Sequence, residues 1–180
     1  VLVNPDGSLG ARNDVQCAAI EHKTGIHASP TCVMAYGEQD GAIGYMVGEE
    51  NKGLAAMFVM MNMARLSVGI EGVAISERAY QHALAYANDR IQGVDSNNQP
   101  MAIIGHADVR RMLMLMKSQT EAMRAMAWSI AEAQDLSLHH PDPLVRTAKS
   151  RFIELMIPVF KACATETGAD VASLGIQIHG

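Results

Sequence analysis

The stretch NKGLAAMFVMMNMARLSVGIEGVAISERAYQHALAYANDR, residues 51–90, decides the fold of this chain. It contains no proline, and its apolar residues recur at the three- and four-residue spacing of one helix face. Those residues are Leu54, Met57, Phe58, Met61, Ala64, Val68, Gly72, Ile75, Ala79 and Leu84. We therefore predict one helix from about Gly53 to Arg90, on the order of 55 Å long at the standard helical rise. A helix of this length is typical of a helix bundle.

Two glycines, Gly69 and Gly72, fall in the middle of this predicted helix. Each costs about 1 kcal/mol relative to alanine, so a compensating role is expected. One interpretation is close packing against a neighbouring helix, or a bend. The other is that a bulky group lies against the helix at this point.

Two more helices are predicted downstream, at about 105–136 and 142–178. The second begins at Asp142 and Pro143, a helix cap followed by a proline in the first turn. The connecting loop is short, which favours antiparallel neighbours. Because an up-down bundle usually has four helices, we expect the fourth to follow Gly180.

The first 48 residues differ from the rest, because short β-like runs alternate there with Gly, Asn, Asp and Pro. Strands are predicted at 1–3, 15–21, 31–36 and 42–47. Because three or four short strands cannot bury a core alone, this segment is expected to be the tail of a β-domain. The predicted fold is mainly α: the end of a middle β-domain (1–48) with short antiparallel strands, then three long antiparallel helices of an incomplete four-helix bundle (49–180).

Composition excludes several classes of function. The formal net charge is −5, and no basic stretch is interleaved with aromatic residues, so we expect no nucleic acid partner. No run of 18 apolar residues is free of charge, so no membrane partner is expected either. The cysteines Cys17, Cys32 and Cys163 lack the spacing of a disulfide framework or a zinc site. This pattern favours a reduced, cytoplasmic compartment and no metal.

Catalytic motifs based on residue types are few. His139 and His140 are adjacent in the predicted loop 137–143, where we expect them to be solvated. Arg65 is the lone cation of an apolar stretch. A buried guanidinium needs an anion or several carbonyls as partners. Arg65 therefore either faces water on the outer side of the helix or helps to position a ligand.

Three segments together resemble the acyl-CoA dehydrogenase superfamily, and most of all the branch that includes methylmercaptopropionyl-CoA dehydrogenases. They are EHKTGIHASPTCVMAYGE (21–38), the stretch from GAIGYMVGEENKG to DRIQG (41–93), and IQIHG (176–180). The resemblance implies a C-terminal fragment that holds the end of the middle β-domain and most of a C-terminal four-helix bundle. The abrupt start at VLV and end at IQIHG also indicate a fragment of a longer protein.

The resemblance implies an enzyme that uses FAD to oxidise an acyl-CoA to the 2,3-enoyl-CoA. In this family a glutamate removes the α-proton and the flavin accepts the β-hydride. Arg65 and Asn62 match positions beside the acyl-CoA. The implied partners are the acyl-CoA substrate, an electron-transfer flavoprotein, and further copies of the chain in a homodimer or homotetramer.

The implied cofactor-binding residues lie at two places in the sequence. Arg90 and Gln92 match a stretch that contacts the FAD diphosphate of a neighbouring subunit, although the aromatic residue that many relatives have before Gly93 is missing here. Gln177 and Gly180, with His179 between them, match the QxxGG segment that meets the same FAD.

The catalytic glutamate is expected beyond Gly180, so no catalytic residue is assigned within the chain. Some relatives carry this base beside the position of Arg65, where the present chain has Ala64. We therefore expect the fragment alone to be inactive. Two alternatives remain open: a non-enzymatic helical oligomerisation module, and a flavoprotein of the same superfamily that acts on another substrate.

Overall fold

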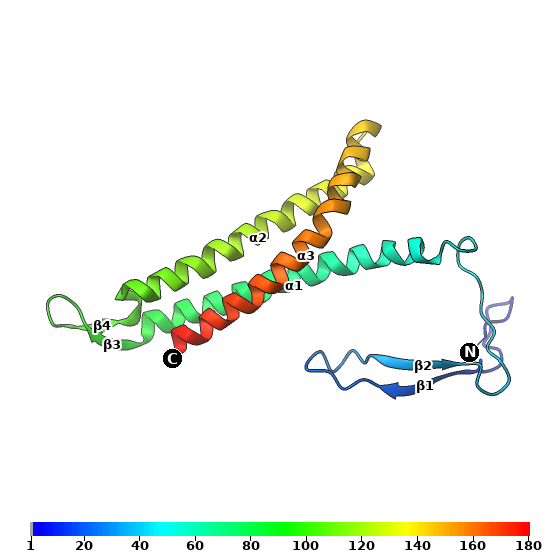
Figure 1. Cartoon of the computed structure of the whole chain (residues 1–180), viewed down its shortest axis with the longest axis horizontal. Helices are drawn as coiled ribbons and strands as arrows, with labels where there is room; N and C mark the ends of the chain where they lie inside the picture. Colours follow the sequence, from blue (N-terminus) through cyan, green and yellow to red (C-terminus); the bar gives the residue numbers. More distant parts are fainter. Residues whose placement is uncertain (1) are drawn as a thin grey trace. The chain divides into compact units, whose positions relative to one another are not determined.

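The computed structural model describes residues 2–180 and contains three long helices and two small antiparallel sheets (Figure 1). It confirms the predicted fold class, because long helices follow a segment of short antiparallel strands. The chain divides into two compact units, of which the first ends at Gly53 and the second comprises Leu54–Gly180.

In the first unit, strand β1 (Val15–Ile20) pairs antiparallel with β2 (Cys32–Tyr36), as predicted for these two segments. The register shifts between Cys17 and Ala19, where β1 carries a bulge. Of the predicted strand 1–3, Val1 lies outside the described residues, and Val3 forms only an isolated bridge with Leu9.

The predicted strand at 42–47 is wrong. Ile43 instead hydrogen-bonds a side chain: its N–H donates to Asn13 Oδ1 at 2.9 Å, and its carbonyl accepts from Asn13 Nδ2 at 2.7 Å. The Asn13 amide thus satisfies both backbone groups of Ile43, in place of a neighbouring strand.

The second unit contains the three predicted helices. They are α1 (Gly53–Asp89), α2 (Ala107–His139) and α3 (Pro143–His179). His139 is the last residue of α2, so its placement in a loop was wrong. The sequence prediction also missed a hairpin between α1 and α2. It consists of β3 (Ile91–Val94) and β4 (Pro100–Ala102), followed by the 3₁₀ turn η1 (Ile103–Gly105).

The turn between α2 and α3 is closed by its own side chains. Asp142 accepts a hydrogen bond from the Leu144 N–H at 2.8 Å and caps α3, with Pro143 in the first turn. Arg146 donates to the carbonyls of His140 and Pro141 at 2.6 and 3.0 Å. These bonds satisfy two carbonyls of the turn after α2 and tie that turn to the first turn of α3.

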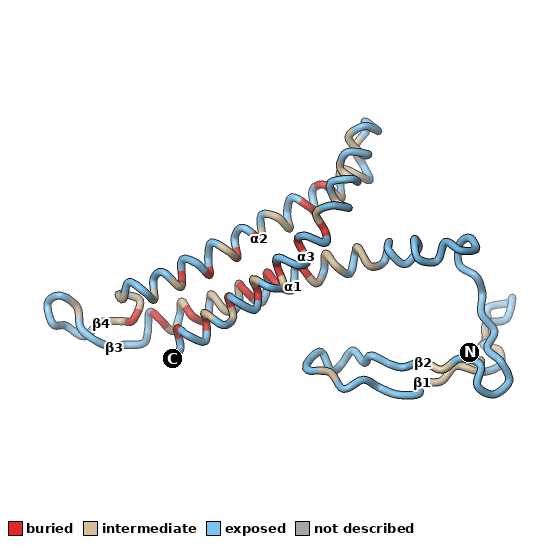
Figure 2. Tube along the Cα trace, viewed as in Figure 1, coloured by how far each residue is buried: buried red, intermediate tan, exposed pale blue. Residues whose placement is uncertain are grey.

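The core of the second unit consists of two clusters along the facing sides of the helices (Figure 2). The cluster near the hairpin contains Ala83, Ala87, Ile103, Leu113, Met116, Val171 and Ile178. The other contains Val73, Met123, Ile130, Ile157, Phe160 and Ala164. Phe160 is the largest fully buried side chain of the described chain.

Gly69 and Gly72 support close helix packing, the first of the two interpretations. A Cβ at Gly69 would overlap the Phe160 ring, and one at Gly72 would overlap the backbone carbonyl of Ala164. On the opposite helix, a Cβ at Gly168 would lie 3.2 Å from the Gly72 carbonyl oxygen. The missing side chains therefore let α1 and α3 approach each other closely.

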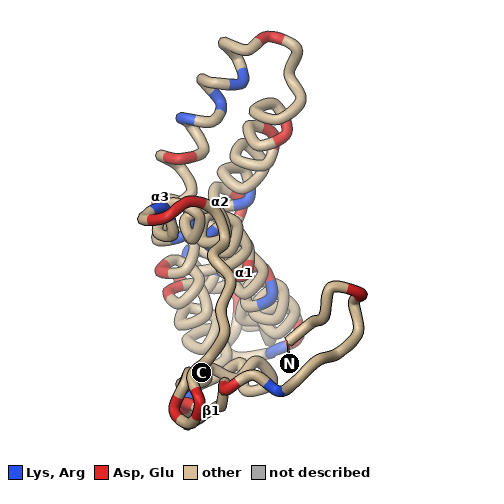
Figure 3. Tube along the Cα trace, turned by 90° about the vertical axis from the view of Figure 1, so that its right-hand side faces the viewer, with Lys and Arg blue, Asp and Glu red and all other residues tan. Residues whose placement is uncertain are grey.

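The first half of α1 is exposed although it is apolar. Its large side chains Leu54, Met57, Phe58, Val59, Met60 and Met63 are all exposed, and the buried residues of α1 begin only at Gly69. By length and composition α1 could cross a membrane, and very little of its most apolar segment is buried. The core helix of a soluble protein passes the same test. Charged residues of both signs occur along the helices (Figure 3).

Candidate functional site

A pocket of about 420 Å³ lies at the end of the helical unit, where α1 and α3 end and α2 begins. Its walls come from segments far apart in the sequence. They are formed by Tyr86, Arg90, Gln92, Ile103, His106, Val109, Gln177, Ile178, His179 and Gly180. We call this the terminal pocket.

The first wall of the terminal pocket is the turn from α1 into β3. The Arg90 N–H donates to the Tyr86 carbonyl at 2.8 Å, and the Arg90 carbonyl accepts from the Ile103 N–H at 2.8 Å. Gly93 follows with φ at +81°, a conformation that glycine adopts without strain. The main chain at Arg90, two residues before Gln92, is therefore fixed by the end of α1 and by η1.

His106 fixes the same turn from the other side. Its Nε2 lies 2.9 Å from the Gln92 carbonyl oxygen. A carbonyl can only accept, so the proton of this hydrogen bond is on Nε2. His106 is also the cap residue of α2, but its side chain makes no cap hydrogen bond.

The second wall is the end of α3. His179 Nδ1 lies 2.7 Å from the Gly175 carbonyl oxygen, and its ring stacks on Tyr86 with the ring centroids 4.5 Å apart. Gly180 ends the helix with φ at +99° and donates its N–H to the Ile176 carbonyl at 3.2 Å. The stacked pair joins the end of α3 to the last turns of α1.

The electrostatics of the terminal pocket favour an anion. Arg90 carries a formal positive charge, and none of the lining side chains named above is a carboxylate. Arg90, Gln92 and Gln177 are exposed, so their side chains are accessible to a ligand. A guanidinium with two amides can donate several hydrogen bonds to phosphate or carboxylate oxygens.

The structure brings the four predicted cofactor-binding residues, Arg90, Gln92, Gln177 and Gly180, to the walls of this one pocket. Sequence reasoning missed Tyr86 and assigned no site role to His106. Tyr86 lies one helical turn before Arg90, so its spacing could have indicated it. His106 gave no such signal, because its position follows from the hairpin that was not predicted.

Arg65 and Asn62, the predicted substrate-binding residues, lie together on α1 outside the terminal pocket. Arg65 Nη1 donates to Asn62 Oδ1 at 3.4 Å, and the guanidinium lies 5.6 Å from the centroid of the Phe58 ring. Both side chains are half-buried. Neither contact gives Arg65 an anionic partner, so its charge remains available for a ligand.

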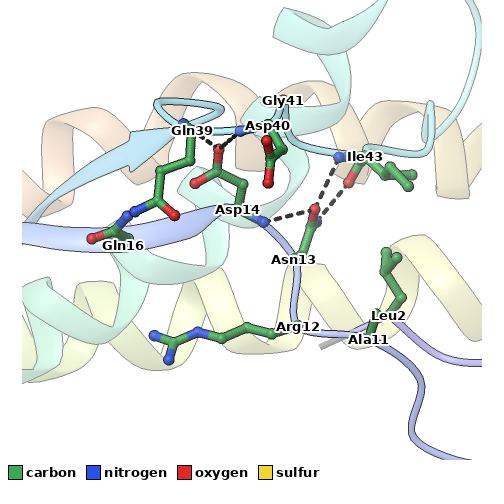
Figure 4. A pocket seen from close by; sticks show the side chains of 10 residues that line it. All are labelled: Leu2, Ala11, Arg12, Asn13, Asp14, Gln16, Gln39, Asp40, Gly41 and Ile43. Atoms are coloured by element: carbon green, nitrogen blue, oxygen red, sulfur yellow. Dashed lines mark hydrogen bonds between the residues drawn. The ribbon is translucent and has the colours of Figure 1, made fainter.

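A second hollow, of about 500 Å³, lies in the first unit (Figure 4). Asp14 accepts backbone hydrogen bonds from Gln39 at 2.7 Å and Asp40 at 3.0 Å. The bond from Gln39 contributes most to lowering the pKa of the Asp14 carboxyl. Asp14 and Asn13 use their side chains to hold the loop that follows β2, so their role here is structural.

The cysteines do not form a nucleophilic site. Cys17, Cys32 and Cys163 are all free and exposed. The Cys17 thiol raises the pKa of Cys32 through a side-chain hydrogen bond, which lowers the fraction of reactive thiolate.

Comparison with known proteins agrees with the observed fold. The profile of the acyl-CoA dehydrogenase C-terminal domain matches residues 51–180. The chain therefore belongs to the acyl-CoA dehydrogenase family.

Among its relatives, the chain is 50% identical to the 3-methylmercaptopropionyl-CoA dehydrogenase of Ruegeria pomeroyi, over 100% of this chain and 30% of that protein. It is 39% identical to a butyryl-CoA dehydrogenase of Syntrophomonas wolfei, over 99% of this chain and 30% of that protein. The chain thus spans about 30% of the length of these relatives.

Solved structures show the same fold. The butyryl-CoA dehydrogenase of Megasphaera elsdenii superposes with a TM-score of 0.72 at 23% identity, over 93% of this chain and 39% of that chain. A Caenorhabditis elegans protein, ACDH-11 in complex with C11-CoA, superposes with a TM-score of 0.78 at 21% identity, over 99% of this chain and 28% of that chain.

Proposed function

We propose that the whole protein is an FAD-dependent acyl-CoA dehydrogenase that oxidises an acyl-CoA to the 2,3-enoyl-CoA. Membership of the family and the names of its relatives support this activity in general. The observation that carries the proposal for this chain is the convergence of Arg90, Gln92, Gln177 and Gly180 on one pocket without carboxylate side chains.

The terminal pocket fits part of FAD, namely its anionic diphosphate. Arg90 supplies the positive charge, and the amide groups of Gln92 and Gln177 supply neutral donors. Gly180 adds no side chain, and a Cβ at this position would meet nothing within 4 Å, so the end of α3 leaves open space. These residues would hold the cofactor in place through its diphosphate.

When bound, FAD supplies the acceptor for the hydride that leaves the β-carbon of the substrate. The residues of this chain bind and orient rather than react. Arg65 and Asn62 are proposed to contact the acyl-CoA, with Arg65 as the available cation of that pair. The glutamate base is proposed to lie outside this chain, because Ala64 beside Arg65 cannot accept a proton.

The proposal extends to the partners. We propose a homodimer or homotetramer in which the terminal pocket serves the FAD of a neighbouring subunit. The exposed apolar residues on the first half of α1 support an assembled state, since large exposed apolar patches mark interaction surfaces. We also propose that an electron-transfer flavoprotein accepts the electrons. We further propose that the whole protein is cytoplasmic.

The test uses the full-length protein. We expect it to purify with bound flavin and to lose its yellow colour when butyryl-CoA or 3-methylmercaptopropionyl-CoA is added without an electron acceptor. Arg90→Ala should weaken FAD binding by about tenfold to a hundredfold, because a charge-assisted hydrogen bond is lost.

The matched control is His82→Ala, an exposed position on α1 outside the terminal pocket, which should bind FAD like the wild type. The proposal fails if the full-length protein binds no flavin, or if its flavin is not reduced by any acyl-CoA offered. The 180-residue chain alone should show no dehydrogenase activity in the same assay.

A further inference from the structure

We propose that His106 is a positioning residue of the terminal pocket: it holds the main chain at Gln92 so that the Arg90–Gly93 turn presents its side chains to the ligand. This inference rests on the proposed function, since the ligand is the FAD diphosphate. His106 itself acts through its contact with the Gln92 backbone rather than by being a main contact of the anion.

The first observation is the hydrogen bond from the His106 ring to the Gln92 carbonyl, at 2.9 Å and across fourteen positions of sequence. It complements the bond from the Ile103 N–H to the Arg90 carbonyl, at 2.8 Å. Two carbonyls of the turn, at Arg90 and Gln92, are thus hydrogen-bonded to Ile103 of η1 and to His106, the residue after η1. The turn cannot rotate these peptides without breaking one of the two bonds.

The second observation is the close approach of the ring to Gly93. A Cβ at Gly93 would lie 3.2 Å from Cε1 and 3.4 Å from Nε2 of His106. Gly93 is thus required both by its φ of +81° and by the space that the ring occupies. The ring therefore leaves little space for a side chain at this position of the turn.

The third observation is that the His106 side chain does not cap α2, although the residue occupies the cap position of that helix. As the cap residue of α2 it could accept a hydrogen bond from the first turn, but the structure shows no such bond. The helix gains no cap hydrogen bond from this side chain, which is half-buried and lines the terminal pocket instead. Its contacts serve the Arg90–Gly93 turn.

The chemistry of the bond suggests the test. Only an N–H donor on the correct side of the ring is needed, and a glutamine side chain also offers an N–H donor. We therefore expect His106→Gln to retain most of the effect and His106→Ala to lose it. Measured on full-length protein freed of flavin and titrated with FAD, His106→Ala should raise the dissociation constant about tenfold.

A double-mutant cycle distinguishes positioning from general stability. If His106 acts by presenting the Arg90 and Gln92 side chains, adding His106→Ala to an Arg90→Ala/Gln92→Ala protein should change the FAD dissociation constant by less than about twofold. A role limited to folding would give the same tenfold loss in both backgrounds. His82→Ala is the control histidine, and its FAD affinity should equal that of the wild type.

The outcomes separate this inference from the proposed function. A wild-type protein that binds no FAD overturns both. A wild-type protein that binds FAD, with His106→Ala equal to it or with additive losses in the cycle, overturns only the role of His106. If His106→Ala does not fold, Gly93→Ala takes its place, and an affinity equal to the wild type for that folded variant overturns the inference.

Discussion

The two halves of α1 are both apolar, yet the structure uses them in opposite ways. From Gly69 onward the helix buries small residues against its neighbours, with Gly69, Gly72, Ser76, Ala83 and Ala87 all buried. Before Gly69 it exposes its largest apolar side chains. Hydrophobic content alone therefore does not determine burial in this helix. The buried half is the one whose small residues allow another helix to approach.

The two halves of α1 differ in what they pack against. The second half meets α3, where Phe160 fills the space beside Gly69 and the Ala164 backbone contacts Gly72. In the first half, all residues up to Met60 are exposed, and Leu66, near its end, packs at the edge of the cluster around Phe160. Substitutions at matched positions of the two halves therefore measure how far their contributions to stability differ.

The largest effect is expected for phenylalanine. Phe160→Ala should lower the free energy of unfolding by about 4 kcal/mol, because a fully buried ring is lost and a cavity remains. Phe58→Ala in the exposed half should cost less than about 1 kcal/mol, since that side chain is 41% exposed. Urea denaturation of both variants measures the difference. Equal losses would contradict the contrast between the two halves.

The next effect concerns glycine. Gly72→Ala places a Cβ against the Ala164 backbone, which cannot move aside, so we expect a loss of about 2 to 3 kcal/mol despite the better helix propensity of alanine. Gly53→Ala, at the first residue of the helix, meets nothing within 4 Å and should be neutral or slightly stabilising. Thermal unfolding of the two variants compares them. A stabilised Gly72→Ala protein would show that α1 and α3 do not pack this closely.

The smallest effect is electrostatic and also lies in the second half of α1. Glu77 forms an ion pair of 2.6 Å with Arg124 of α2, and this hydrogen bond lowers the pKa of the Glu77 carboxyl from its ordinary value of 4.5. A lowered folded-state pKa stabilises the protein above pH 4.5, and this contribution is lost as the pH falls through the folded-state value.

The pair is partly exposed, so Glu77→Gln should cost less than about 1 kcal/mol at neutral pH. Its cost should shrink as the pH is lowered below 4.5, which denaturation at several pH values measures. A cost that is independent of pH would exclude the ion pair as its source. Glu121→Gln, which alters the exposed contact between Glu121 and Arg124, is the matched control.

Sequence patterns predicted the helices well because each has strong local signals. The Asp142–Pro143 start of α3 and the uninterrupted apolar spacing of α1 are examples. The hairpin β3–β4 was missed because its strands are short and contain little β-periodicity. The strand expected at 42–47 was wrong because the Asn13 side chain satisfies the Ile43 backbone, a pairing across thirty positions that no local pattern indicates.

The residues of the terminal pocket were also only partly predictable from the sequence. Resemblance to the family predicted Arg90, Gln92, Gln177 and Gly180 residue by residue, and the fold brings them together. Their role toward FAD stays a prediction. The supporting contacts of His106 and Tyr86 depend on tertiary packing, so spacing alone could at most indicate Tyr86.

A ligand bound in the terminal pocket should stabilise the folded state of the bundle. Because the walls of the pocket come from the end of α1 and the end of α3, an anion held there links two chain segments that separate when the bundle unfolds. Such a ligand binds only the folded state, so each tenfold rise in its free concentration above the dissociation constant should add about 1.4 kcal/mol of stability. The cofactor would thus act as a non-covalent cross-link, and the docking of α3 could be followed by flavin titration.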